Sequence, residues 1–385
     1  MQYAHIHNKY TVKRLVEYCP KIKHVTITTS YLNADHYDLL HRLNLETIVH
    51  RAIRDSEITL RFKNLKNLDV WNISYFNVEN CTELENISVK SYSSEVDLSG
   101  FAKLKSVRIN DTAYLEELPP KLPFTKLNLK STLTDEILRL PLDTLHIEVG
   151  RFINKILPIL ERANLKHLKI KCQLPSGRAL GAGFTREIHM PNLRTLELLY
   201  ITVRLSMLKF TNITDLSMIR CKFVCEQFKI LAITKLTLEG CNIDLDSLTL
   251  RLKYLSIRDC NITGSLSQLP ETLEYLEIID SDVVIGNLSR LSKLHTLIIN
   301  IVNEEDNLLI TDEALISISK LPIRVLSLCG CGLNDSHMDY LADMQINDLN
   351  LESNDITMVG IRKLRRLPLR KLEVSDIPLL DMMLC

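Results

Sequence analysis

The sequence predicts an α/β solenoid, a single array of short parallel strands in which each strand is stacked on the next. Three observations support this prediction. One short apolar pattern returns along nearly the whole chain, its spacing stays between 18 and 29 residues, and no linker rich in Gly, Ser or Pro divides the 385 residues. A regular pattern of this period without a seam is typical of one repeat domain.

The repeated pattern is an apolar residue, two others, an apolar residue, one other, and a third apolar residue. Its middle residue returns about seventeen times between positions 25 and 372. A single unit leaves these side chains half in water, whereas stacked units cover them, and each buried Leu or Ile then contributes roughly 1.5–3 kcal/mol. Clear copies are Leu65, Leu68 and Val70; Leu193, Leu196 and Leu198; and Ile346, Leu349 and Leu351.

The last copy but one is the most complete. From Ile346 to Ile356 it matches the leucine-rich-repeat pattern, with Asn354 at the ninth position. The chain resembles the leucine-rich-repeat superfamily over nearly its whole length. Its last units resemble the ribonuclease-inhibitor and F-box leucine-rich types, and no F-box is seen in the sequence. The resemblance implies a horseshoe or arc with a parallel concave β-sheet, and a role in binding other proteins.

The same resemblance implies a structural role for the ninth position, where Asn or Cys bonds the backbone of the turns. We expect a buried ladder of such side chains between neighbouring units. The alternative, redox or metal chemistry, requires cysteines that converge on one point. The ninth position carries Cys221, Cys241, Cys260, Cys331 and Asn354.

We expect one leucine-rich-repeat domain over residues 1–385, with an N-terminal capping helix in 1–20, about seventeen repeats over 21–380 and an inserted loop at 172–192. Helix caps and apolar periodicity fall at 11–18, 33–43, 152–162, 311–320, 335–344 and 357–367. Pro158 is expected to kink or break the helix at 152–162. Elsewhere, intervals of 18–21 residues leave too little chain for a helix. The convex side is therefore expected to be irregular in the middle, with helices near both ends.

Composition excludes several classes of function. Lys and Arg together number 47, as do Asp and Glu, so the net charge of zero does not favour nucleic acid or an acidic membrane. The sequence shows neither a signal-peptide core nor the roughly 18 apolar residues of a membrane span. The 10 cysteines are scattered, without the paired spacing of a zinc site. We expect a cytoplasmic protein with free thiols.

The loop at 172–192 contains three glycines, Gly177, Gly181 and Gly183. Their spacing matches neither GxxxxGK[ST] nor a GxGxxG placed between a strand and a helix, so a phosphate-binding loop is not indicated. We expect a flexible excursion that is able to touch a bound partner. His5 and His7 lack a second ligand pair, and no GxSxG occurs. The sequence therefore predicts no catalytic residue, no metal site and no cofactor.

Residues that alternate with the buried pair of each strand should face the concave side. Along the chain this face changes from basic to aromatic and aliphatic, and then to acidic. Two simpler explanations stay open: that the lysines only solvate the sheet, and that Trp71 packs against its neighbouring unit. We predict that a partner binds on this face through Trp71, Lys90, Arg108, Lys126, Lys130, Lys169, Lys171, Leu199, Tyr254, Tyr275 and Ile279.

The resemblance favours a protein–protein interaction scaffold, and we expect a monomer that binds a protein partner and no membrane. Leu15 to Ile27 is similar to a helix-to-strand unit of F-box leucine-rich proteins, so one alternative is a substrate-recognition subunit or adaptor of a ubiquitin ligase. A second alternative is RNA or polyanion binding through the basic part of the concave face. Zero net charge and 6% aromatic residues count against it. No motif supports an enzyme.

Overall fold

A computed structural model describes residues 3–29, 31–51, 54–71, 73–78, 80–90, 101–110, 126–129, 142–149, 153–172, 183–208, 211–223, 228, 231–248, 251–281, 283, 285–301 and 310–374. For residues 54–58, 73–77, 90, 108–110, 126–129 and 223 it describes the backbone alone. The chain forms two compact units, unit 1 over Met1–Gly177 and unit 2 over Arg178–Cys385. Each unit is described by itself, and the expectation of one domain over 1–385 stays a prediction.

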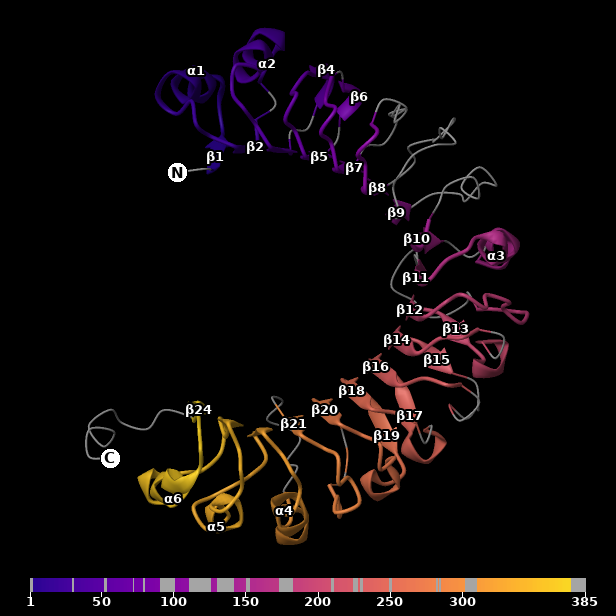
Figure 1. The fold of residues 1–385 in the computed structure, drawn as a ribbon, viewed down its shortest axis with the longest axis vertical. Coiled ribbons are helices and arrows are strands. Elements are labelled where there is room, and N and C mark those ends of the chain that lie inside the picture. The colour runs from indigo at the N-terminus through magenta and orange to yellow at the C-terminus, as the bar shows by residue number, and fades with distance from the viewer. Residues whose placement is uncertain are drawn as a thin grey trace. The chain divides into compact units, whose positions relative to one another are not determined.

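Unit 1 is built on a parallel sheet in which each strand pairs with the next one in the repeat. Helices α1 (Lys9–Tyr18), α2 (Ala34–Leu40) and α3 (Ile153–Arg162) lie on the other side of the chain from this sheet (Figure 1). A second small sheet on that side pairs β4 (Arg54–Leu60) with β6 (Ile73–Val78). The strands of the main sheet are β1 (Tyr3–Ile6), β2 (His24–Ile27), β3 (Thr47–His50), β5 (Asn67–Trp71), β7 (Asn86–Lys90), β8 (Ser106–Asn110), β9 (Lys126–Leu129), β10 (Thr144–Val149) and β11 (His167–Cys172).

Unit 2 repeats this construction with a second run of parallel strands. They are β12 (Thr195–Leu199), β14 (Asp215–Ile219), β16 (Lys235–Glu239), β18 (Tyr254–Arg258), β20 (Tyr275–Ile279), β21 (Thr296–Asn300), β22 (Val325–Cys329), β23 (Asp348–Asn350) and β24 (Lys371–Glu373).

The other side of unit 2 changes along the chain. It begins with short parallel pairs, β13 (Thr202–Val203) with β15 (Lys222–Phe223) and β17 (Asn242–Asp244) with β19 (Asn261–Thr263). It then carries the helices α4 (Asp312–Ser319), α5 (Met338–Leu341) and α6 (Met358–Lys363), the last followed by a 3-10 turn at Leu364–Arg366. The region expected to be irregular therefore contains small strands, because two or three extended residues fit an interval too short for a helix.

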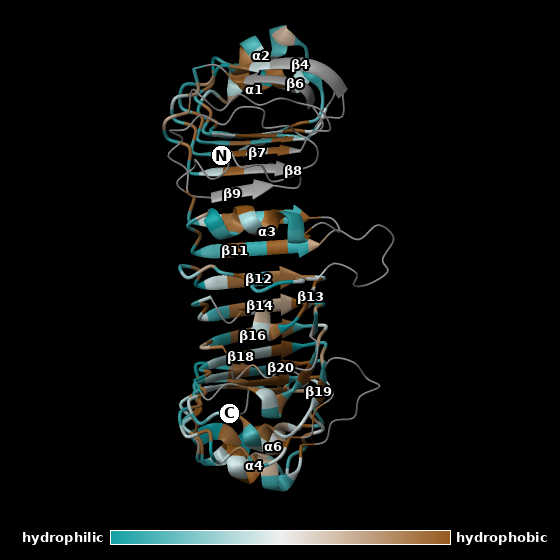
Figure 2. Cartoon of the chain, turned by 90° about the vertical axis from the view of Figure 1, so that its right-hand side faces the viewer, coloured by the Kyte–Doolittle hydropathy of each residue, from teal (hydrophilic) through white to brown (hydrophobic). Residues whose placement is uncertain are grey.

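The register of the strands explains the core. Parallel pairing places the middle apolar residues of neighbouring repeats directly side by side, without a shift. Hydrophobic and hydrophilic positions alternate along these strands (Figure 2), as the pleat requires. In unit 2 the middle residues from β12 to β23 are at most 1% exposed, whereas Leu372 on the terminal β24 is 36% exposed. The members of this row are Leu196, Leu216, Leu236, Leu255, Leu276, Leu297, Leu326, Leu349 and Leu372.

The ladder expected at the ninth position is confirmed. The thiols of Cys221, Cys241 and Cys331 donate to backbone oxygens of the preceding repeats over 3.3 to 3.4 Å. Asn354 does the same more strongly, donating from Nδ2 to the Leu328 oxygen at 2.7 Å and accepting from the Leu333 amide at 2.9 Å. Burial raises the pKa of Cys221 to about 11, so this thiol stays protonated and able to donate at neutral pH.

Most helices lie where the sequence predicts them. Asn33 and Thr311 cap α2 and α4 through their side chains, and Pro158 lies inside α3. The helix expected at 335–344 is shorter, since α5 begins only at Met338. The described helices are too short or too polar to cross a lipid bilayer.

Two expectations about segments need correction. Residues 1–20 contain α1 as expected, but also the strand β1, which pairs with β2 and makes this segment a complete repeat rather than a helical cap alone. The inserted loop expected at 172–192 begins in β11, because Cys172 is the last residue of that strand. Its second half is packed into the array: Phe184, Ile188 and Met190 are at most 5% exposed. Apolar residues at those positions make an excursion into solvent unfavourable.

One polar pair interrupts the core of unit 1. His50 occupies an inward position of β3 whose register neighbour on β2 is Ile27 and on β5 is Val70. It is 3% exposed and accepts a hydrogen bond at Nε2 from the hydroxyl of Tyr37 on α2. Burial lowers the pKa of His50 to about 4, so the imidazole is neutral in the folded protein at pH 7.

This pair predicts a pH dependence for unit 1. Below its ordinary pKa of about 6.5, His50 takes up a proton in the unfolded chain but not in the folded one. Unit 1 should therefore lose stability, by about 3 kcal/mol, as pH falls from about 6.5 to about 4. Urea unfolding followed by the fluorescence of Trp71, the only tryptophan, measures this change.

The variant Tyr37→Phe/His50→Leu removes both polar partners and should abolish most of this pH dependence. The control His167→Gln changes an exposed histidine on β11 and should keep it. If the unfolding free energy depended equally on pH in the two variants, His50 would not be the titrating group.

Candidate functional site

The candidate site lies on the open face of the unit 2 sheet, defined here as the side that carries the first, third and fifth residues of the strands. The second and fourth residues of β12, β14, β16, β18 and β20 are buried, while most of the residues that alternate with them are partly exposed. Because the register is not shifted, residues at the same position of neighbouring strands form straight rows across the sheet.

Two tyrosines form the centre of this face. Tyr254 on β18 and Tyr275 on β20 are register partners, and their rings stack with centroids 4.2 Å apart and planes 10° from parallel. On the other side of Tyr254, the Nζ atom of Lys235 lies 4.6 Å from the ring centroid. Stacking of such a pair contributes about 0.5–1.5 kcal/mol, and a cation–π contact at an exposed site about 0.5–1 kcal/mol. The result is a fixed, flat aromatic surface flanked by a cation.

The next rows add an anchored ion pair. Arg258 Nη2 donates to Glu277 Oε1 at 2.7 Å and Arg258 Nε to Glu277 Oε2 at 3.3 Å, while the Ser256 hydroxyl donates to the same Oε2. The Glu277 side chain is 6% exposed and that of Arg258 is 49% exposed. The buried carboxylate is therefore satisfied by two residues of the neighbouring strand β18, and it holds the guanidinium in one orientation toward solvent.

The ion pair and the tyrosines influence one another. Hydrogen bonding to Glu277 raises the pKa of Arg258 above its ordinary value. Burial raises the pKa of Tyr275, and the negative charge of Glu277 raises it further, so the phenol stays protonated over the physiological range. Lys235, Tyr254, Tyr275, Arg258 and Glu277 thus form one connected group, the tyrosine–arginine patch.

The other residues predicted in unit 2 lie in the row of fifth positions. Ile279 is next to Arg258 in this row and borders the tyrosine–arginine patch. Leu199 on β12 is in the same row but four strands away, about 19 Å at the usual strand spacing. Both side chains are partly exposed. Ile279 therefore extends the patch, and Leu199 lies outside it.

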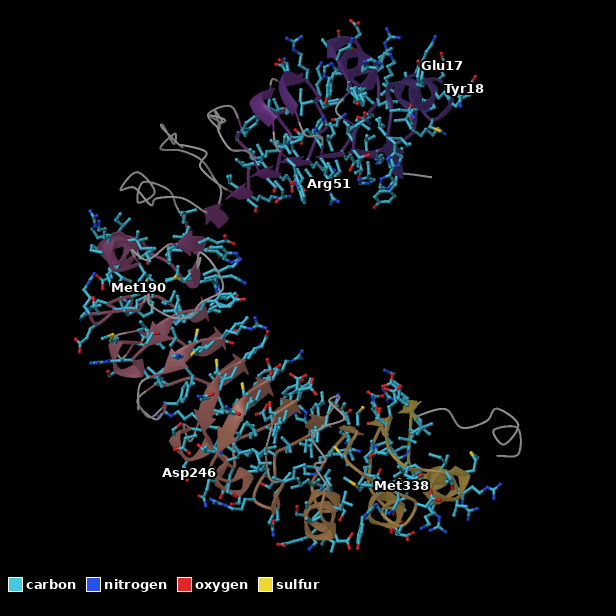
Figure 3. All side chains as sticks on the ribbon, turned by 180° about the vertical axis from the view of Figure 1, so that it is seen from behind. Glu17, Tyr18, Arg51, Met190, Asp246 and Met338 are labelled. Atoms are coloured by element: carbon cyan, nitrogen blue, oxygen red, sulfur yellow. The ribbon has the colours of Figure 1, made fainter. Side chains whose placement is uncertain are left out.

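In unit 1, Trp71 is less available than the sequence suggested. Its Nε1 donates to Asp69 Oδ1 at 3.0 Å, and the Arg51 guanidinium lies 4.9 Å from the ring centroid. Arg51 follows β3, the neighbouring strand, and projects on the side of unit 1 away from α1 and α2 (Figure 3). The tryptophan is half-buried and packs against its neighbouring repeat, as the structural alternative for Trp71 expected.

The predicted basic residues are only partly described. Lys169 and Lys171 are both on β11 and half-buried, and Lys171 forms an ion pair with Glu148 at 3.1 Å, which reduces the local positive charge. The backbone of Lys90, Arg108 and Lys126 lies on β7, β8 and β9. The side chains of these three residues, and the whole of Lys130, lie outside the described residues.

Arg258, Glu277 and Lys235 belong to the site but were not predicted from the sequence as members of it. Their positions in the repeat placed them on the open face, but nothing in the sequence showed that Arg258 and Glu277 pair across strands. The register of the strands could have indicated this pair. Arg258 is the fifth residue of β18 and Glu277 is the third residue of β20, and residues at these two positions of neighbouring strands are diagonal neighbours. Among the described residues, no group of three or more His, Cys, Asp or Glu side chains is arranged to hold a metal ion.

The anchored pair predicts an unequal effect of two substitutions on stability. Arg258→Ala leaves the buried Glu277 carboxylate without a counter-charge and should lower the free energy of unfolding by about 1–3 kcal/mol. Glu277→Gln leaves only the half-exposed guanidinium unpaired, which water can solvate, and should cost less than about 1 kcal/mol. Urea unfolding of unit 2, followed by circular dichroism, measures the loss of unfolding free energy in each variant. A larger loss in Glu277→Gln would contradict the described geometry.

Comparisons with known proteins concern the fold alone. No protein-family model matches the chain, and no curated protein matches it. Similar solved structures include an internalin from Listeria monocytogenes, at 12% identity over 96% of this chain and 94% of that one, with a TM-score of 0.34. A leucine-rich-repeat protein of Leptospira interrogans is 14% identical over 92% and 90%, with a TM-score of 0.38.

A third similar structure is the leucine-rich-repeat ectodomain of the plant membrane receptor kinase GASSHO1/SCHENGEN3 from Arabidopsis thaliana, at 14% identity over 98% of this chain and 62% of that one, with a TM-score of 0.29. Beside these likenesses, the chain itself shows the repeated apolar pattern, one parallel strand for each described copy, and the ladder of Cys and Asn at the ninth position. Each unit therefore has the α/β fold of leucine-rich repeats, with one parallel strand for each described copy of the pattern.

Proposed function

We propose that this chain is a protein–protein interaction scaffold whose open face in unit 2 binds a protein segment at the tyrosine–arginine patch. The observation that carries the proposal is the stacked pair Tyr254 and Tyr275 beside the anchored Arg258. Tyr and Arg are among the residues that dominate binding energy at protein interfaces. Side chains that are already fixed lose little conformational entropy when a partner binds.

The charges of the open face indicate the chemistry of the partner. Between β12 and β24 its first, third and fifth positions carry more acids than bases. The acids are Glu197, Asp215, Glu239, Glu277, Asp348 and Glu373, and the bases are Lys235, Arg258 and Lys371. A face of this sign attracts Lys or Arg and repels phosphate. The partner is a basic protein segment with an aromatic or aliphatic residue that covers the tyrosines.

The cysteines support a proposed cytoplasmic location. The thiols of Cys221, Cys241, Cys260 and Cys331 are free and buried, and each is bonded to backbone oxygen. Burial raises the pKa of Cys241 and of Cys331 to about 12, which keeps both thiols protonated. A reducing compartment preserves such reduced thiols during folding.

The proposal predicts the outcome of a peptide selection. A random peptide library selected on the intact chain should yield peptides that combine Lys or Arg with an aromatic or aliphatic residue. The affinity of such a peptide should fall by about thirtyfold in Tyr254→Ala/Tyr275→Ala, the equivalent of about 2 kcal/mol. Fluorescence anisotropy with the labelled peptide measures the change.

The matched control is Tyr10→Ala/Tyr18→Ala, which removes two exposed tyrosines on α1. The control should leave the affinity unchanged. A selection without any basic peptide, or equal affinity in both variants, would contradict the proposal. Binding of RNA that falls steeply with salt and is lost when Lys169 and Lys171 are reversed to Glu would favour the polyanion alternative instead.

A further inference from the structure

Charged residues at the start of the strands are paired from one repeat to the next. In unit 1 the residue that precedes each strand alternates in sign from Lys23 through Glu46, Lys66 and Glu85 to Lys105. Glu46 pairs with both Lys23 and Lys66, and Glu85 pairs with Lys105 at 2.8 Å. We call the residues at this position the flank row.

Further copies of the flank row follow the same rule. Lys166 lies 3.9 Å from Asp143 of the preceding repeat in unit 1, and Lys253 pairs with Glu274 of the next repeat in unit 2 at 2.9 Å. Pairs of this kind on the surface contribute little stability each. In unit 2 two other flank-row residues, Arg194 and Arg324, donate instead to the backbone oxygens of Asn212 and Gln345.

The repeat that contains β24 is rich in arginine. Arg370 is the flank-row residue of β24, and no later strand follows among the described residues. Arg362 on α6, with Arg365 and Arg366 in the 3-10 turn, adds three further cations. All four arginines are exposed, and none forms an ion pair with another described residue. We call these four residues the C-terminal arginine cluster.

The neighbouring charges of this repeat do not neutralise the cluster. Lys363 pairs with Asp339 at 2.8 Å, and Lys371 with Glu373 at 2.8 Å, so the nearby acids on α5 and β24 already have partners. A terminal repeat needs a polar outer surface for solubility, but solubility does not require a single sign of charge. The four arginines therefore add positive charge that the paired acids of this repeat do not neutralise.

We propose that the C-terminal arginine cluster is a docking surface for an acidic protein segment, separate from the open face. The carboxylates of that segment pair with the exposed guanidinium groups. Arginine suits this role because its planar guanidinium binds a carboxylate through two parallel hydrogen bonds. The exposed Val359 and the partly exposed Leu372 offer apolar contact beside the charges.

The composition of the surface disfavours nucleic acid and lipid. Residues 358–374 contain no Phe, Tyr, Trp or His, so no aromatic ring is available on which a base could stack. Met358, Leu364 and Leu367 are buried, so the helical segment has no apolar face to insert into a membrane. Nucleic acid or a lipid surface would therefore be held only by long-range electrostatic attraction.

A second copy of this chain is also disfavoured. Head-to-tail stacking would bring the C-terminal arginine cluster against the first repeat of another molecule. The helix of that repeat, α1, exposes Lys9, Lys13 and Arg14, with Glu17 as the only acid within it. Two surfaces of the same sign repel, so the partner is a different, acidic protein.

The test uses a fluorescein-labelled peptide of alternating Glu and Leu, titrated with the intact chain at low and at physiological salt. We expect binding that weakens with salt. Arg362→Glu/Arg365→Glu/Arg366→Glu/Arg370→Glu should reduce the affinity at least about tenfold. The control Lys9→Glu/Lys13→Glu/Arg14→Glu/Lys21→Glu makes the same change in net charge at the first repeat and should bind like the wild type.

A second variant keeps the test decisive if four reversals destabilise the repeat. Replacement of the four arginines by lysine retains the charge and should still lower the affinity, because lysine cannot form the two parallel bonds. Tyr254→Ala/Tyr275→Ala should bind the acidic peptide normally, which separates this surface from the open face. Absence of binding to the wild type, equal binding in the reversal and control variants, or tighter binding of poly-uridylate or of anionic vesicles would overturn the proposal.

Discussion

The unshifted register between neighbouring parallel strands is the constraint on which the rest of this structure depends. It places Leu236 beside Leu255 and Leu255 beside Leu276, so that each repeat covers the leucines of the next. The same hydrogen-bonded pairing orders the open face, because the residues that alternate with the leucines must also line up from one strand to the next. A shift by one residue would expose the leucines and bury Tyr254, Tyr275 and Arg258.

Register also explains why binding chemistry can be built from residues far apart in the sequence. Ser256 and Glu277 are separated by 21 positions, yet they are direct register partners and share a hydrogen bond. The buried carboxylate would be unfavourable in isolation, and Ser256 and Arg258 together offset its desolvation. The outcome is a guanidinium whose orientation is fixed by the sheet and which is ready to meet a partner.

Much of the fold could be predicted because the leucine pattern has a direct physical consequence. The triplet Leu193, Leu196 and Leu198 indicated β12 and its inward side, and the caps Asn33 and Thr311 indicated α2 and α4. β1 was missed because Tyr3 to Ile6 is too short to show the full pattern. Residues 183–192 were misread because glycines suggested a loop, while the buried Phe184 and Met190 anchor the segment.

The candidate site was predictable only in part. Tyr254 and Tyr275 were found because aromatic residues at open-face positions are unusual, and their stacking follows from the register. The pairing of Arg258 with Glu277 depends on side-chain conformations that the repeat does not fix. Trp71 shows the opposite case: its position was predicted correctly, but Arg51 lies over its ring and Asp69 accepts from its indole nitrogen, which reduces its availability. Position in the repeat indicates where a side chain points, and its neighbours decide whether it is available.

The most direct test is a double-mutant cycle on the unfolding free energy of unit 2 with Tyr254→Ala and Tyr275→Ala. If the two rings are stacked register partners, the effects of the single substitutions should not add, and the coupling should be about 0.5–1.5 kcal/mol. The same cycle between Tyr254 and Thr296, which lies two strands away in the same row, should give no coupling. Additive effects of Tyr254 and Tyr275 would contradict the register, and with it the surface that we assign to binding.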